Sequence, residues 1–120
     1  MNTEAVAPGG DERSRTAAAC LFDGFGDRSR LAILQHLMVG EHRVVELTEH
    51  LGLAQSTVSK HLACLKDCGL VESRPVGRAS VFSVTHLQAT ADLLRAAEQL
   101  LALTGDAVTL CPSHGVSVHG

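Results

Sequence analysis

Residues 54–68 constrain the fold of this chain most strongly. Read as a helix, the stretch places Val58, Leu62 and Leu65 at i, i+4 and i+7, which makes one narrow apolar stripe. The run Val44–Leu51 before it reads as a shorter amphipathic helix, and Gly52 separates the two. Two helices joined by a short turn containing glycine are typical of a helix-turn-helix. An ordinary solvated helix would fit this stretch alone equally well.

The outward side of the second helix carries short, polar or cationic side chains, which suit close approach to another surface. At roughly 100° per residue, these positions are Ser56, Lys60, Ala63 and Asp67.

Two strand-like runs follow the second helix and sharpen its interpretation. Gly69 is suited to end the helix, and Leu70–Pro75 and Ala79–Val84 then predict a β-hairpin. A hairpin directly after a recognition helix is the wing of a winged helix. Arg74 and Arg78 lie at its base and near its tip, where phosphates would be met.

The remaining elements complete a single domain that is mainly α with a small β-hairpin. We expect a helix over 11–22, a turn over 23–26, a helix capped by Asp27 and running through Leu37, and an amphipathic helix over 86–103. The predicted organisation is a disordered tail at 1–10, a winged helix-turn-helix DNA-binding and dimerisation domain at 11–104, and a flexible tail at 105–120. The apolar face of the last helix favours a homodimer, formed together with the first helix.

Charge and composition limit the partners. The chain has 120 residues and a net charge of −3, which argues against indiscriminate nucleic-acid binding. Residues 54–84, however, hold four basic and two acidic side chains, so the local field favours DNA. The sequence shows neither a signal peptide nor a membrane span. We therefore expect a cytoplasmic protein without a membrane partner, whose four cysteines are thiols. Motifs typical of enzymes are absent from the sequence.

Cysteines at i, i+4 form the strongest candidate metal site. Cys64 and Cys68 would project from one side of the recognition helix, and two thiolates on adjacent turns can hold one soft ion. A third ligand must come from elsewhere, and Cys111 in the tail is the best candidate. Cys20 is expected to be a packed helix residue, with a supporting ligand role as the alternative. Three thiolates suit Cd(II) or Pb(II); Zn(II) more commonly takes a fourth ligand. For an arbitrary pair at this spacing, two small buried side chains are the commoner outcome.

The run from Glu46 to Leu62 resembles the DNA-binding core of the ArsR/SmtB metal-sensing repressors. The likeness covers roughly residues 20–103, and 56–62, Ser-Thr-Val-Ser-Lys-His-Leu, is its most specific part. Residues 26–34 are similar to the family's second helix, with Arg28 where proline is usual. Within the family, Cys64 and Cys68 resemble the cysteine pair of the CmtR-type cadmium/lead sensors, which favours a ligand role.

The resemblance implies a homodimeric repressor that binds a palindromic double-stranded operator and releases it when Cd(II) or Pb(II) binds, with Zn(II) possible as the ligand. His61 would touch DNA backbone, pack, or support the cysteine ligands, and Arg74 and Arg78 would hold phosphates. The side chains expected in the major groove are Gln55, Ser56, Thr57, Ser59 and Lys60.

Three alternatives stay open at this stage. A thiol-redox-sensing repressor would oxidise Cys64, Cys68 or Cys111. A zinc or nickel sensor would use nitrogen and oxygen ligands, for which the candidates are His86, Asp92, His114 and His119. A protein-interaction module would have lost DNA binding altogether.

Overall fold

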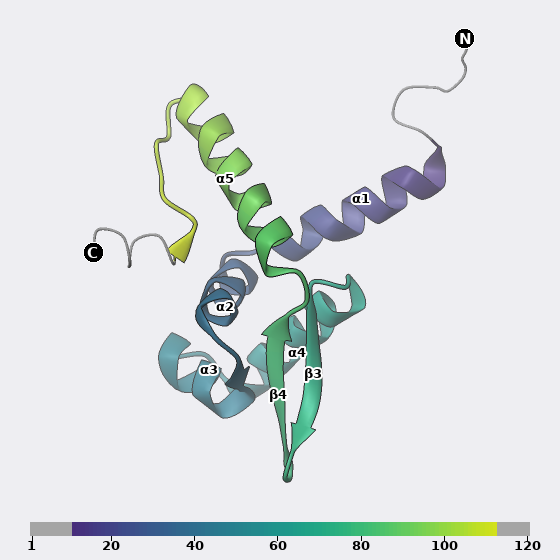
Figure 1. Ribbon diagram of the computed structural model, residues 1–120, viewed down its shortest axis with the longest axis vertical. Coiled ribbons are helices and arrows are strands. Elements are labelled where there is room, and N and C mark those ends of the chain that lie inside the picture. The colour runs from purple at the N-terminus through teal and green to yellow at the C-terminus, as the bar shows by residue number, and fades with distance from the viewer. Residues whose placement is uncertain (1–10, 113–120) are drawn as a thin grey trace.

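The computed structural model describes residues 11–112, which form five helices and a three-stranded antiparallel sheet (Figure 1). The elements in chain order are α1 (Glu12–Phe25), α2 (Arg28–Val39), β2 (His42–Arg43), α3 (Val44–Leu51), α4 (Gln55–Asp67), β3 (Val71–Val76), β4 (Ala79–Val84) and α5 (Leu87–Leu103). The fold is a winged helix-turn-helix, as predicted. The tail predicted at 1–10 lies outside the described residues, and of the tail predicted at 105–120 only 105–112 is described.

Local sequence signals set the boundaries of the helix-turn-helix. The Asp27 carboxylate accepts hydrogen bonds from the backbone N–H groups of Ser29 and Arg30, at 2.9 and 3.0 Å, and so caps α2. Gly52 ends α3 with φ of 68°, and Gly69 follows α4 with φ of 78°. Both glycines therefore occupy the left-handed region that other residues enter at a cost.

The wing is the predicted hairpin, in which β3 and β4 pair from Val71↔Val84 to Val76↔Ala79. One strand was missed. His42 and Arg43, for which the sequence predicted no element, form β2 and pair with Phe82 and Val81 of β4. A two-residue strand has too few positions to show alternation in the sequence.

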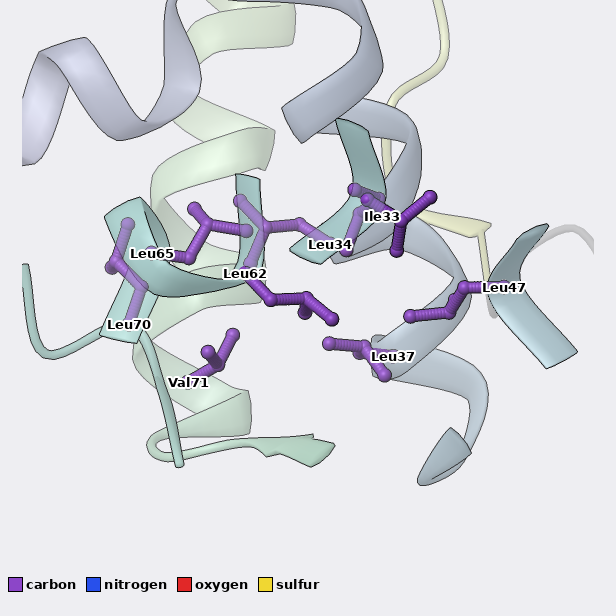
Figure 2. Close-up of a cluster of buried hydrophobic side chains, with 9 residues drawn as sticks. Ile33, Leu34, Leu37, Leu47, Leu62, Leu65, Leu70 and Val71 are labelled. Carbon is purple, nitrogen blue, oxygen red and sulfur yellow. The ribbon is translucent and has the colours of Figure 1, made fainter. Parts of the chain in front are cut away.

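The main core joins the helix-turn-helix to the wing. The stripe Val58, Leu62 and Leu65 is fully buried, as predicted, and faces α2, α3 and the start of β3. Figure 2 shows the labelled members of this cluster: Ile33, Leu34, Leu37, Leu47, Leu62, Leu65, Leu70 and Val71. Burying these side chains fixes α4 against the rest of the unit and leaves its opposite side outward.

The first helix is longer than predicted and extends through Phe25, so the expected turn at 23–26 is wrong. Glycine at 24 and 26 suggested a turn, but Gly24 is buried inside the helix, where a Cβ atom would lie 2.7 Å from Leu70 Cδ1. The glycine therefore serves the close approach of α1 to the end of α4.

The elements from α2 to β4 form the winged unit. Helices α1 and α5 project away from this unit in different directions (Figure 1). Residues 11–20 are all exposed, and on α5 Leu100 and Leu103 are 64% and 84% exposed. Where α5 meets α2, a second small cluster buries Met38, Ala91, Leu94 and Cys111. Within the described part of the chain, every helix is too short or too polar to cross a membrane.

Candidate DNA interface and cysteine cluster

The outward side of α4 carries the side chains predicted to meet DNA bases. Gln55, Ser56, Ser59 and Lys60 are exposed, and Thr57 is half-buried beside Val58. These residues occupy the first two turns of the helix, the part of a recognition helix that reaches base edges in a helix-turn-helix. Their short side chains and one cation permit hydrogen bonds and a phosphate contact.

His61 is turned away from that outward side. Its Nε2 atom lies 3.6 Å from an Asp27 carboxylate oxygen, and its Nδ1 atom lies 3.4 Å from a guanidinium nitrogen of Arg30. Only 17% of the side chain is exposed. The imidazole and the backbone hydrogen bond from Arg30 both hold the pKa of Asp27 below its usual value, and the hydrogen bond acts more strongly. His61 therefore joins α4 to the start of α2, which corresponds to the packing role among those predicted.

The wing carries two arginines in different settings. Arg78 follows the turn at Gly77 and is exposed near the hairpin tip. Arg74 pairs with Glu41 at 2.6 Å, a contact that bridges the wing and the segment before β2. Because both partners of this pair are substantially exposed, Arg74 can exchange Glu41 for a phosphate at little cost.

The cysteine pair of α4 lies at the C-terminal end of the recognition helix. The Cys68 backbone N–H donates to the Cys64 carbonyl at 3.1 Å, so the helical spacing extends to Cys68, which caps the helix. Both side chains are half-buried. The two sulfurs thus belong to adjacent turns on one flank of α4.

Cys20 of α1 is the partner that sequence reasoning missed. The structure joins it to Cys68 as a disulfide, with the two Cα atoms 5.9 Å apart. The expectation that all four cysteines are thiols is therefore wrong for this pair, and Cys20 lies exposed rather than packed. The two positions are 48 residues apart and no local pattern links them. Packing of α1 against the end of α4 brings them together.

Cys111, the predicted third metal ligand, occupies a different cluster. Its side chain is 2% exposed among Met38, Ala91 and Leu94, with Sγ 3.6 Å from the Ala91 carbonyl oxygen. The Cys111 backbone N–H donates to the Glu98 carboxylate at 3.0 Å. Burial is the main cause that raises the pKa of the Cys111 thiol above its usual value. The free thiols of the described residues are Cys64 and Cys111.

Three histidines from separate elements also gather in space. The ring centroids of His36 on α2, His42 on β2 and His50 on α3 lie 5.2–6.1 Å apart in edge-to-face arrangements. Burial lowers the pKa of His36 below its usual value, and the electrostatic effect of the neighbouring His50 and His42 rings lowers it further. No local pattern in the sequence links these three residues.

Across residues 11–112, the structure contains no group of three or more His, Cys, Asp or Glu side chains that could hold a metal ion. The structure has the Cys20–Cys68 disulfide formed. His86 and Asp92, two members of the alternative nitrogen and oxygen site, are both exposed at the start of α5. The other two, His114 and His119, lie outside the described residues.

Comparisons with known proteins agree with the winged helix-turn-helix fold and its DNA-facing helix. The family described as "Bacterial regulatory protein, arsR family" matches residues 27–73, from the start of α2 into the wing. A probable mercury resistance operon repressor of Streptomyces lividans is 39% identical over 93 residues, which cover 78% of this chain and 74% of that protein. The HTH-type transcriptional regulator CmtR of Mycobacterium tuberculosis is 38% identical over 90 residues, which cover 75% of this chain and 73% of that protein.

A solved structure shows the same fold. HlyU from Vibrio cholerae N16961 superimposes with a TM-score of 0.62 at 32% sequence identity, over 72% of this chain and 97% of that chain.

Proposed function

Because the chain belongs to the arsR family of bacterial regulatory proteins, we propose that it is a homodimeric repressor that releases a palindromic operator when a soft metal ion binds its cysteine thiolates. Proteins of this family are DNA-binding transcription regulators and not enzymes. One observation carries the proposal: α4 presents a polar outward side for DNA and a cysteine pair at its C-terminal end. In this proposal, metal binding at that pair acts on the DNA-facing side through the helix that carries both.

The DNA-binding surface combines the first half of α4 with the wing. Gln55, Ser56, Thr57 and Ser59 supply groups for base edges, while Lys60 meets bases or phosphates. Arg78, and Arg74 once it leaves Glu41, hold the backbone on either side. The positive groups thus flank the groove-reading face, although the whole chain has a net charge of −3.

The dimer is supported by the apolar surface that the single chain leaves uncovered. Leu100 and Leu103 are exposed on α5, and Phe22 is 59% exposed on α1. Exposed apolar side chains of this size on two projecting helices favour a contact with a second copy. A two-fold axis there would set two recognition helices toward half-sites about one DNA turn, roughly 34 Å, apart.

The cysteine pair supplies the chemistry expected of a soft-metal site. Thiolate ligands select soft ions such as Cd(II) and Pb(II), and Zn(II) remains a possible ligand. Cys64 and Cys68 must lose their thiol protons to bind. Linkage then requires that DNA weakens metal binding by the same factor by which metal weakens DNA binding. The prediction that Cys111 donates a third thiolate stays a prediction.

The test uses operator DNA selected from a random pool by the metal-free, reduced protein. Titration with Cd(II) should release the protein from this DNA, as followed by fluorescence anisotropy, whereas Mg(II) at equal concentration should not. The Cys64→Ser variant should bind the operator and stay bound. Operator binding that ignores Cd(II), Pb(II) and Zn(II) alike would refute a metal sensor.

The Cys20–Cys68 pairing favours one second candidate, a repressor that responds to thiol oxidation. Such a protein would release the operator with oxidised glutathione and without metal. The metal sensor would release it with Cd(II) in a reducing buffer. The two functions are therefore separated by one binding assay under two conditions.

A further inference from the structure

We propose that Cys20 of α1, and not Cys111, provides the third thiolate of a metal site beside Cys64 and Cys68. The Cys20–Cys68 disulfide is then the oxidised form of this site, which cannot bind the metal. The inference rests on the proposed soft-metal function and identifies its ligand set. It also assigns a role to α1, whose residues up to Cys20 are exposed in the single chain.

Packing of α1 fixes Cys20 next to the end of α4. Leu21 and Phe25 pack against the main core, and the missing Cβ of Gly24 lets the helix approach Leu70 closely. Cys20 and Cys68 consequently have Cα atoms 5.9 Å apart, and Cys68 Sγ lies 3.1 Å from the Cys20 carbonyl oxygen. Two side chains held this close on packed helices can direct both sulfurs toward one ion after reduction.

Cys64 extends this pair into a set of three. It lies one helical turn before Cys68, and the hydrogen bond between their backbones keeps that turn regular. Three thiolates from two rigid helices give a donor set suited to a soft divalent ion. Metal binding by the reduced site displaces three thiol protons and leaves three sulfur–metal bonds.

Cys111 is a poorer source of the third sulfur within the same chain. Its thiol is buried against α5, and its backbone N–H is tied to Glu98. The neighbouring Leu110 carbonyl also accepts a hydrogen bond from the Gln35 side chain at 2.9 Å. To reach α4, this segment would have to leave its place between α2 and α5 and give up these contacts.

Oxidation consumes two of the three ligands. When Cys20 and Cys68 react with oxidised glutathione, one protein disulfide forms, the glutathione disulfide breaks, and two glutathione thiols carry away the two electrons and two protons. A phosphine reverses the change: phosphorus takes an oxygen atom from water, and the two cysteines regain their protons. Only the reduced protein therefore offers the complete site.

Metal bound by Cys20 and the α4 pair would tie α1 to the recognition helix. Helix α1 belongs to the uncovered surface assigned to the dimer, and α4 reads the DNA. A bond between them couples the relative placement of the two subunits to the orientation of α4. In this proposal, the contact between α1 and α4 is the element through which metal binding would change DNA binding.

The experiment is an anaerobic Cd(II) titration of the full-length protein, reduced by a phosphine that is then removed. Ultraviolet absorption from thiolate-to-metal charge transfer reports the number of sulfurs, and competition with a chelator reports the affinity. The matched variants are Cys20→Ser and Cys111→Ser, and circular dichroism checks that each is folded. Cys64→Ser in parallel tests the proposed function separately.

We expect Cys20→Ser to lose about a third of the absorption, since two of three sulfurs remain, and at least about tenfold in Cd(II) affinity. Cys111→Ser should match the unaltered protein in both. Wild-type absorption and affinity in Cys20→Ser, or a loss in Cys111→Ser as large as that expected for Cys20→Ser, would overturn the proposal. Unchanged Cd(II) binding in Cys64→Ser would instead show that the pair Cys64 and Cys68 does not bind the metal, which would refute the proposed function itself.

The oxidised state gives a second, independent readout. Protein treated with oxidised glutathione, with the Cys20–Cys68 bond verified by mass spectrometry of linked peptides, should lose the charge-transfer absorption and regain it after phosphine treatment. Undiminished Cd(II) binding by the disulfide-bonded protein would contradict the inference.

Discussion

The winged unit and the two projecting helices differ in how far they bury their apolar side chains. From α2 to β4, apolar side chains of several elements meet in one closed core that includes Leu34, Leu47 and Leu62. On α1 and α5, by contrast, large apolar side chains such as Phe22, Leu100 and Leu103 face outward. The first region therefore buries its apolar side chains within one chain, whereas the second would bury them only in the dimer proposed above. The cysteines 20 and 68 lie where the two regions meet.

The largest expected effect is on the closed core. Replacing Leu62, which is 1% exposed, with alanine should lower the free energy of unfolding by roughly 2–5 kcal/mol, because a cavity opens under the recognition helix. Urea denaturation followed by circular dichroism measures the loss. Ala63→Ser on the exposed side of the same helix is the control and should change stability by about 0.5 kcal/mol or less. Equal losses in both would show that the stripe is not the core.

The projecting helices should respond in assembly rather than in folding. Leu100→Glu would place a charge in the proposed interface and weaken the dimer by about 2 kcal/mol or more. Sedimentation should then detect monomers that keep the helical content of the parent. Leu100→Met, which conserves volume and apolar character, should stay dimeric. Leu94 is unsuited to this test because the chain already buries it against Met38.

DNA binding by the winged unit should depend on its positive side chains. The double change Lys60→Ala/Arg78→Ala removes two positive side chains from each subunit, so it should weaken binding of the dimer on all sequences and reduce the slope of log affinity against log salt by about 4. Fluorescence anisotropy at several salt concentrations gives this slope. The charge-conserving variant Lys60→Arg/Arg78→Lys should keep it. An unchanged slope in the alanine variant would show that these two side chains do not contact DNA phosphates.

The smallest expected effect concerns acid sensitivity of the winged unit. The pKa of His36 is lower in the folded protein than its usual value of 6.5, so the unfolded chain binds more protons as the pH falls. The free energy of unfolding should therefore rise from pH 5.5 to 7.5, and His36→Gln should flatten that rise. This window lies above the titration of Glu46, whose pKa is itself lowered, chiefly by a backbone hydrogen bond from Arg43. If the free energy of unfolding rises as much in His36→Gln as in the parent protein, groups other than His36 cause the rise.

Local patterns predicted the winged unit well because its signals are short-range. The stripe at Val58, Leu62 and Leu65, the Asp27 cap, and the glycines at 52 and 69 each act within a few residues, and all are confirmed. The signals misled where packing across the chain decides: the two glycines at 24 and 26 suggested a turn, yet α1 continues through Gly24.

The candidate site was only partly predictable for the same reason. Cys64 and Cys68 were recognisable from their spacing in one helix. The neighbour of Cys68 is Cys20, at a separation of 48 residues, and the three histidines come from three elements. Contacts of this range arise from tertiary packing and leave no periodic trace in a single sequence. Three roles were expected for His61, and its contacts with Asp27 and Arg30, which hold it against α2, correspond to the packing role.

In the proposed function, cysteines at the end of the recognition helix control DNA binding. Operator release against Cd(II) concentration, compared for the reduced parent protein and Cys68→Ser, tests it most directly. We expect both proteins to bind the operator equally without metal, and only the parent to release it as Cd(II) rises, because a hydroxyl is a poor ligand for a soft ion. Release of Cys68→Ser at the Cd(II) concentration that releases the parent would contradict the account.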